Sequence, residues 1–360
     1  MPWCYLYCHT QIRYYTLCNI LWGLLHESFL YVSGLCTLTT HSMNILTLCY
    51  SNHRPETLAM VTPIIEQHDA VFLEEPHHER FQAMLRGDFA IDELLLELDL
   101  EYPLFTRQYY KMLQRMAFQG KDIIQIEPFM DYLLQIHSFF AEGHAPEELD
   151  NNTILYDVYI AERNATGRLL AYYKASRASN FDRLLQSMQE FAKTDAQRFK
   201  LRDRLRADAI IDALKRGCDS FVEAGNMHQY LHSLLKKHLP QDWELRVHRV
   251  EQEIAAQTGL MGTIMSPGDE LTLAYVFGTP LKRIQENLLC AQSLIYAKII
   301  HKEEVDGGDQ SFPHVRDELR TINTVNTLSL DDCRKLYFDI FALPTHKAQE
   351  VVRGYLQRKI

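Results

Sequence analysis

The chain has 360 residues, of which 47% are hydrophobic, and this is enough to bury a sizeable core in one or two domains. Its formal net charge of −10 excludes general binding to the phosphate backbone of nucleic acids, which requires clustered Lys and Arg. The eight cysteines form no CxxC pair, which argues against a common structural zinc site and a disulfide framework. We therefore expect reduced thiols and a cytoplasmic protein.

The first 43 residues are rich in Cys, Tyr, Leu and Thr and show no sustained helical or strand period. Their apolar run, Leu17–Leu25, is too short to span a bilayer, and no clean cleavage site follows it. A loose extension, a weak membrane anchor and upstream sequence outside the folded domain are all compatible with this composition. We favour a poorly structured extension over residues 1–43, and no other segment has the hydropathy of a membrane span.

From residue 44 to about residue 250, short apolar runs of strand length alternate with helical patterns. The expected strands are Asn44–Cys49, Ala70–Leu73, Asp122–Ile126, Ser220–Glu223 and Trp243–Val250. The helical patterns cover Pro55–Gln67, His77–Leu85, Ile91–Leu98, Thr106–Phe118, several packed helices within Met130–Leu214, and Gln229–His238. Such alternation predicts a mostly parallel sheet with right-handed crossovers.

Beyond residue 260 the chain reads as helical, interrupted by the loop Asp306–Asp309. The expected helices are Asp269–Phe277, Lys282–Lys302 and Leu330–Arg358. The fold class predicted is therefore α/β, with a small, mostly parallel sheet flanked by many helices and a helical C-terminal extension. We expect an α/β domain over residues 44–250, with a helical insertion at about 130–214, and a helical region over residues 251–360.

Polar residues follow four successive predicted strands, and this shared position is the main functional signal. They are His53, the pair Glu74–Glu75, Glu127, and the segment Gly225–His228. Ligands of open parallel sheets bind outside the carboxyl ends of the strands. We therefore expect these residues to meet at one edge of the sheet.

These residues resemble the motifs of the TraB family and, more distantly, of the erythromycin-esterase-like and ChaN-like proteins. The family carries a GxxH motif after its first strand and a second one near the other end of the domain. The second motif is intact as Gly225–His228, whereas in the first His53 is in place but Tyr50 stands where glycine is expected. Glu75 followed by Arg80 resembles the family's acidic residue and arginine, and Asp203–Arg206 resembles its acidic-Arg-x-Arg helix. The resemblance covers roughly residues 44–250.

Some members of this family are thought to be metal-dependent proteases, and relatives open ester or lactone bonds, so the resemblance implies a hydrolytic site. Imidazole and carboxylate groups suit Zn or Mn, and His53, His228 and Glu75 are the candidate metal ligands. His53, His228, Glu75 and Glu127 are also the candidate catalytic residues, as bases or proton carriers. Hydrogen-bonded structural histidines and solvated carboxylates at helix N-termini remain the alternatives.

Alternation along a strand sends Glu74 and Glu75 to opposite faces, so only one of them can point into a given cleft. The resemblance favours Glu75, because its spacing to Arg80 fits the family. The residues expected to bind the substrate are Gly225, Asn226, Arg202, Arg204 and Arg206. Arg202 and Arg206 share one helix face whereas Arg204 points elsewhere, and surface ion pairs with Asp203 and Asp208 are the alternative for this helix.

Two hypotheses for function remain open at the level of sequence. The first is a hydrolase, with or without a divalent metal, that acts on a peptide or ester bond. The second is a non-enzymatic ligand-binding or regulatory protein that uses the same cleft, favoured by the bulky Tyr50 in the first motif. Both imply a small molecule or peptide as partner, without nucleic acid or membrane, and leave the oligomeric state open. The chain has no Walker loop and no GxGxxG, so no nucleotide cofactor is expected.

Overall fold

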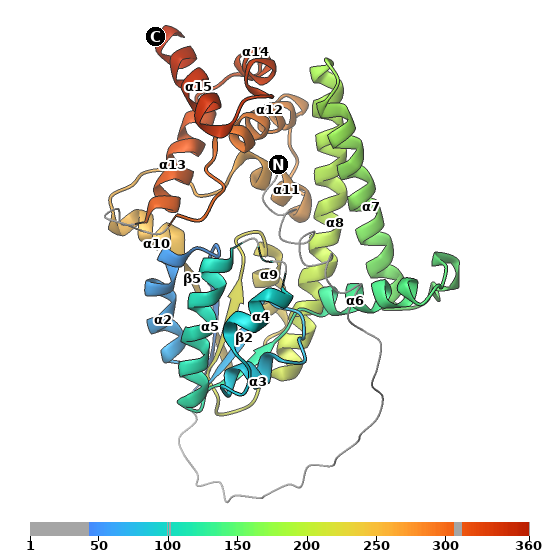
Figure 1. Ribbon diagram of the computed structural model, residues 1–360, viewed down its shortest axis with the longest axis vertical. Helices are drawn as coiled ribbons and strands as arrows, with labels where there is room; N and C mark the ends of the chain where they lie inside the picture. The colour runs from blue at the N-terminus through green and yellow to red at the C-terminus, as the bar shows by residue number, and fades with distance from the viewer. Residues whose placement is uncertain (1–42, 99, 101, 306–311, 360) are drawn as a thin grey trace, which may run out of the picture.

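The computed structural model describes residues 43–98, 100, 102–305 and 312–359, so the prediction for residues 1–43 lies outside the described residues except for Met43. The described chain forms an α/β fold whose five strands are all parallel, in the order β3-β2-β4-β1-β5 (Figure 1). The strands are β1 (Asn44–Tyr50), β2 (Ala70–Leu73), β3 (Asp122–Gln125), β4 (Ser220–Ala224) and β5 (Trp243–Arg249). The predicted fold class is confirmed.

Helices cover both faces of the sheet, which explains why β1, β2 and β4 read as nearly continuous apolar runs. One face, which carries Val71, Leu73 and Phe221, packs against α2, α3, α5 and α10. The other face, which carries Leu48, Phe72 and Val222, packs against α8 and α9. The helices on the first face are α2 (Leu58–Glu66), α3 (Phe81–Leu85), α5 (Pro103–Phe118) and α10 (Val250–Gln257); on the second, α8 (Phe181–Ala213) and α9 (Gln229–His238).

The long helix α8 connects the sheet to the rest of the molecule. Its 33 residues span about 50 Å at the rise of an α-helix. The C-terminal half lies on the sheet through Ala207 and Ile210, and the N-terminal half packs against the C-terminal helices through Phe181 and Met188. It forms a hairpin with α7 (Ile154–Ser176) that rises beside the C-terminal region, and α6 (Pro128–Ala141) lies at its base (Figure 1).

The C-terminal region lies above the carboxyl edge of the sheet (Figure 1). Its helices are α11 (Pro267–Phe277), α12 (Arg283–Ile299), α13 (Pro313–Asn326), α14 (Leu330–Ile340) and α15 (Thr345–Lys359). Helix α12 is the centre of this region, because its residues from Leu289 to Ile299 are almost all buried. No helix in the described ranges combines the length and the apolar character needed to cross a bilayer.

Some helix predictions require correction. Helices α10 and α13 lie in or next to the region expected to be helical, but their bounds were not predicted. The expected helix Leu330–Arg358 is two helices, because Pro344 lacks the N–H group that a continuing helix needs. The helix expected from His77 begins only at Phe81. The backbone N–H groups of His77 and His78 instead donate to the side chains of Asp131 and Gln125, which holds this segment as a loop. The remaining short elements are η1 (Pro55–Thr57), α4 (Ile91–Glu97) and η2 (Pro146–Glu148).

Candidate functional site

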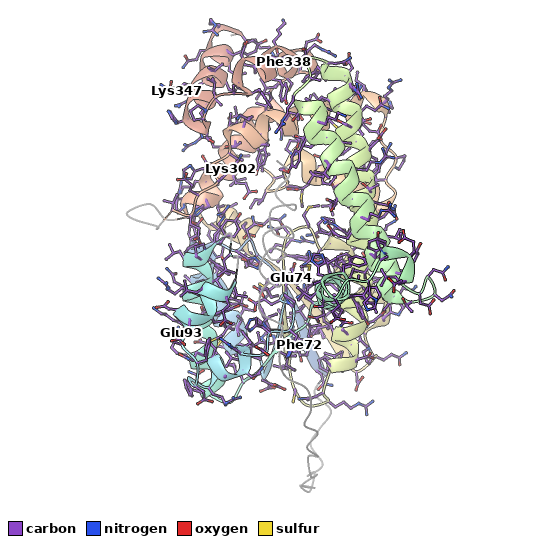
Figure 2. All side chains as sticks on the ribbon, turned by 45° about the vertical axis from the view of Figure 1, so that its right-hand side comes forward. Phe72, Glu74, Glu93, Lys302, Phe338 and Lys347 are labelled. Atoms are coloured by element: carbon purple, nitrogen blue, oxygen red, sulfur yellow. The ribbon has the colours of Figure 1, made fainter. Side chains whose placement is uncertain are left out.

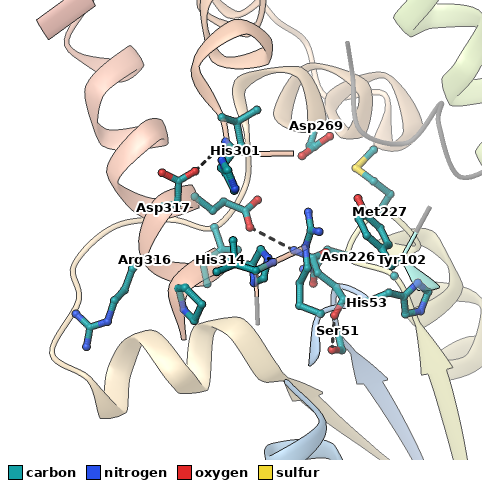
Figure 3. A pocket seen from close by; sticks show the side chains of 18 of the residues that line it. Ser51, His53, Tyr102, Asn226, Met227, Asp269, His301, His314, Arg316 and Asp317 are labelled. Carbon is teal, nitrogen blue, oxygen red and sulfur yellow. Dashed lines mark hydrogen bonds between the residues drawn. The ribbon is translucent and has the colours of Figure 1, made fainter. Parts of the chain in front are cut away.

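A cavity of about 380 Å³ lies between the carboxyl edge of the sheet and the C-terminal region, a volume that suits a small ligand (Figure 3). Its floor comes from the segments that follow the strands and from Arg202 of α8, and its roof comes from α11, α13 and the segments beside them. The floor includes Ser51, Asn52, His53, Arg54, Glu74, Arg202, Gly225, Asn226, Met227 and His228. The roof includes Ile264, Asp269, Ile300, His301, His314, Asp317 and Glu318.

His53 lines the floor and pairs with Glu223, which lies behind it. His53 Nε2 lies 3.2 Å from Glu223 Oε1, and their side chains are 11% and 9% exposed. The backbone N–H of Glu74 donates to the other oxygen of Glu223 at 3.1 Å, and the ring of Phe105 lies 5.1 Å from that of His53. Burial opposes a charged imidazole, but the hydrogen bond and charge of Glu223, with Glu74 and Glu75, raise the pKa of His53 above its ordinary value.

Glu74 is the centre of a buried cluster of charges and lies near the middle of the molecule (Figure 2). Its oxygens contact Arg202 Nη2 at 3.1 Å, Arg206 Nη1 at 3.2 Å and His228 Nε2 at 2.9 Å. The backbone N–H of Gly225 also donates to Glu74, at 2.6 Å. Despite the cost of burial, the charges of His228, Arg206 and Arg202 hold the pKa of Glu74 well below its ordinary range.

His228 is held between two carboxylates. Its Nε2 faces Glu74 and its Nδ1 contacts Asp203, whose second oxygen accepts from the backbone N–H of Leu231 at 3.0 Å. Although burial opposes the charge, Glu74 and Asp203 raise the pKa of His228 to about 9. At neutral pH this residue is therefore an imidazolium with both N–H groups engaged.

This protonation state bears on the predicted metal, because a ligating histidine must offer a neutral nitrogen with a free lone pair. His228 offers none in this arrangement, because Glu74 and Asp203 occupy both of its ring nitrogens. Within the part of the chain that the structure describes, no three His, Cys, Asp or Glu side chains are grouped so as to hold a metal ion. The Zn or Mn prediction for His53, His228 and Glu75 stays a prediction.

Arg206 and Glu127 lie behind the floor and do not line the cavity. Both side chains are fully buried. Arg206 donates to the backbone carbonyls of Ile126 at 3.0 Å and Glu223 at 2.6 Å, and Glu127 accepts from Arg202 Nε at 2.9 Å. These residues join the ends of β3 and β4 to α8, so they hold the floor together rather than face a ligand.

Glu74 lines the cavity and Glu75 does not, although the charge of Glu75 still acts on His53. Alternation along β2 places Glu74 on the face covered by α8, where the arginines lie, and Glu75 on the opposite face. Glu75 accepts from Tyr110 and Gln125 at 3.1 Å each in a separate, smaller pocket, and burial followed by the charge of Glu223 raises its pKa to about 7. Arg80 pairs with Glu97 at the surface instead of contacting Glu75.

The three arginines of α8 lie on the helix faces that their spacing predicts. Arg202 and Arg206 are buried on one face of α8, whereas Arg204 is exposed and absent from the cavity lining. Arg202 therefore reaches the site together with Gly225 and Asn226. The substrate-binding role predicted for Arg204 is not compatible with this position.

The sequence did not single out Glu223, Glu251 or Glu318: Glu318 lines the cavity, and the other two contact residues that line it. Glu223 is the only charged residue of the buried strand β4, and this was the available signal. Glu251 accepts from the backbone N–H of Asn52 at 2.5 Å and from Asn226 Nδ2 at 3.2 Å, and burial raises its pKa to about 7. Glu318 of the roof accepts from Asn52 Nδ2 at 3.3 Å, and burial, Glu251 and Asp269 raise its pKa to about 8.

Tyr50, which stands at the glycine position of the first motif, does not narrow the cavity. Its buried side chain points to α9, where its hydroxyl donates to the carbonyl of His228 at 3.1 Å. The guanidinium of Arg249 lies 4.7 Å above its ring. The departure from the motif therefore leaves the position of His53 on the floor intact.

Comparison with known proteins gives one informative similarity. The chain is 24% identical over 290 residues to an uncharacterized protein of Archaeoglobus fulgidus, and the match covers 80% of this chain and 96% of the relative. No protein-family model matches the chain. No solved structure matches it.

Proposed function

We propose that this protein is a hydrolase that opens an ester or peptide bond of a small molecule held in the cavity, with His53 as the general base. The observation that carries the proposal is His53, which lines the floor of a cavity at the carboxyl edge of a parallel sheet and pairs with the buried carboxylate of Glu223. The resemblance of the strand-end motifs to the TraB family supports the same class of reaction.

In this proposal neutral His53 removes a proton from a water molecule, whose oxygen attacks the carbonyl carbon of the substrate. Glu223 orients the imidazole and balances the charge that it gains, as the carboxylate of a catalytic triad does. The proton then passes to the leaving oxygen or nitrogen, and the bond breaks. Arg202 and the imidazolium of His228 line the same floor, and their positive charges favour the negative oxygen of the tetrahedral intermediate, although the N–H groups of His228 are engaged by Glu74 and Asp203.

The second candidate function is ligand binding without turnover. It is favoured because the charged groups of the floor are already paired with one another. Glu74 contacts Arg202, Arg206 and His228, and these contacts stabilise the fold. A preformed polar surface of this kind binds a ligand with little rearrangement. Binding measured by calorimetry, with no product formed, would support this second function.

The replacement His53→Asn tests the hydrolase directly. We expect it to lower kcat/KM toward a panel of p-nitrophenyl esters and p-nitroanilide peptides by about a hundredfold or more, the usual contribution of a general base. The melting temperature should change little, because Asn retains hydrogen-bonding capacity beside Glu223. Metal analysis of the same purified protein tests separately whether Zn or Mn takes part.

His248→Asn is the matched control. His248 Nδ1 contacts Glu253 at 3.1 Å, but these side chains are 36% and 37% exposed and neither lines the cavity. We expect this variant to keep the activity of the wild type. Equal activity of the two variants would show that His53 is not the base.

A further inference from the structure

Two carboxylates connect the C-terminal region to the sheet, and each binds the first turn of a helix on the opposite side. Glu56, in η1 beside the sheet, accepts from the backbone N–H groups of His314 at 3.0 Å and Val315 at 3.1 Å. These are the second and third residues of α13 in the C-terminal region. The N–H groups of a first turn have no partner within the helix, so a carboxylate there is well placed.

Glu304 makes the reciprocal contact. It belongs to the C-terminal region and accepts from the backbone N–H groups of Leu104 at 2.9 Å and Phe105 at 2.8 Å. These are the second and third residues of α5, which covers the sheet. Each side of the cavity thus supplies a carboxylate for a helix of the other side.

The imidazole of His314 joins the two contacts. Its Nδ1 lies 2.5 Å from Glu56, and its Nε2 accepts from the backbone N–H of Val305, next to Glu304, at 3.0 Å. A ring that accepts at Nε2 donates from Nδ1, so the tautomer is consistent with both contacts. The ring of His314 therefore ties Glu56 to the backbone of the segment that carries Glu304.

The contacts of Glu56 and Glu304 both hold segments that lie next to His53. Glu56 follows His53 by three residues in the chain. Glu304 fixes Phe105, whose ring packs against His53 at 5.1 Å and against Tyr109 at 5.2 Å. Tyr109, one turn further along α5, lies close enough to Glu223 that burial and the charge of Glu223 raise its pKa. The position of α5 thus sets the ring that packs against His53 and a neighbour of Glu223.

We propose that Glu56 and Glu304 are positioning residues, through which docking of the C-terminal region onto η1 and α5 orients the His53–Glu223 pair. The inference deepens the proposed hydrolase function and rests on it for its effect on activity. The C-terminal region then has two tasks: it supplies the roof of the cavity, and it completes the geometry of the floor.

The test uses the full chain with ¹³C-labelled histidine and follows the NMR signals of the His53 ring, assigned with His53→Asn. In Glu304→Gln and Glu56→Gln we expect a changed chemical shift for His53 and loss of its nuclear Overhauser contact with Phe105. We also expect kcat to fall ten- to about a hundredfold with a smaller change in KM, as for a displaced catalytic group. Glu148→Gln is the control, since Glu148 accepts from the backbone N–H of Ala145 at an exposed site.

Unchanged His53 signals in both variants, whatever their melting temperatures, would overturn the proposal and leave the two contacts as simple stabilising caps. Glu304→Asp distinguishes the effect of side-chain length from the effect of the negative charge, because it keeps the carboxylate but shortens the side chain. It is also judged by the same signals if Glu304→Gln does not fold. If the wild type hydrolyses no substrate while the His53 signals respond as expected, the hydrolase proposal fails and the positioning role stands.

Discussion

Replacing Arg206 with Ala is expected to lower the free energy of unfolding by about 3–5 kcal/mol, the usual cost of removing one partner from a buried ion cluster. The side chain of Arg206 is fully buried and contacts Glu74 and Glu127. The substitution also leaves the backbone carbonyls of Ile126 and Glu223 without this donor. Urea unfolding followed by circular dichroism measures the difference.

Arg204→Ala is the control, since Arg204 lies two residues away on the exposed face of the same helix. Removal of an exposed charge changes stability by less than about 1 kcal/mol. If the two variants were equally stable, the interpretation of Arg206 as the charge that holds Glu74 and Glu127 in the core would be wrong.

The second large effect is a loss of stability at alkaline pH caused by His228. The fold raises the pKa of this residue from 6.5 to about 9, so it favours the protonated form. The contribution is complete below pH 6.5 and is lost as the pH rises through about 9. At 1.36 kcal/mol per pKa unit, the loss amounts to about 3 kcal/mol.

Urea unfolding at pH 6.5 and pH 9.5 should therefore show a smaller pH dependence in His228→Gln than in the wild type. The comparison is necessary because Glu75, Glu251 and Glu318, whose pKa values are raised, also weaken the fold as the pH increases. The same pH dependence in both proteins would mean that His228 is not held as an imidazolium.

The sheet and the floor of the site could be predicted from the sequence, because the patterns that indicate them lie within short segments of the chain. The runs in β1, β2 and β4 are apolar on both faces, and parallel strands bring the residues that follow them to one edge. His53 and His228 consequently line one cavity, as expected. The spacing of Arg202 and Arg206 likewise fixed their common face on α8.

The roof of the cavity could not be predicted from the sequence, because it depends on contacts between distant parts of the chain. Glu56 and His314 are 258 residues apart, and neither residue type marks such a pairing. The faces of Glu74 and Glu75 could not be assigned from the sequence for a related reason. Alternation separates the two side chains, but only the position of α8 shows which face carries the compensating arginines.

The pH dependence of kcat/KM, in the wild type and in Glu223→Gln, tests the central claim that His53 acts as a base paired with Glu223. A base must be deprotonated to act, so activity should rise with pH. Burial opposes the imidazolium, but Glu223 outweighs it and raises the pKa of His53 above 6.5. The account predicts a rise centred above pH 6.5 in the wild type and at lower pH in Glu223→Gln. A rise at the same pH in both proteins would contradict it.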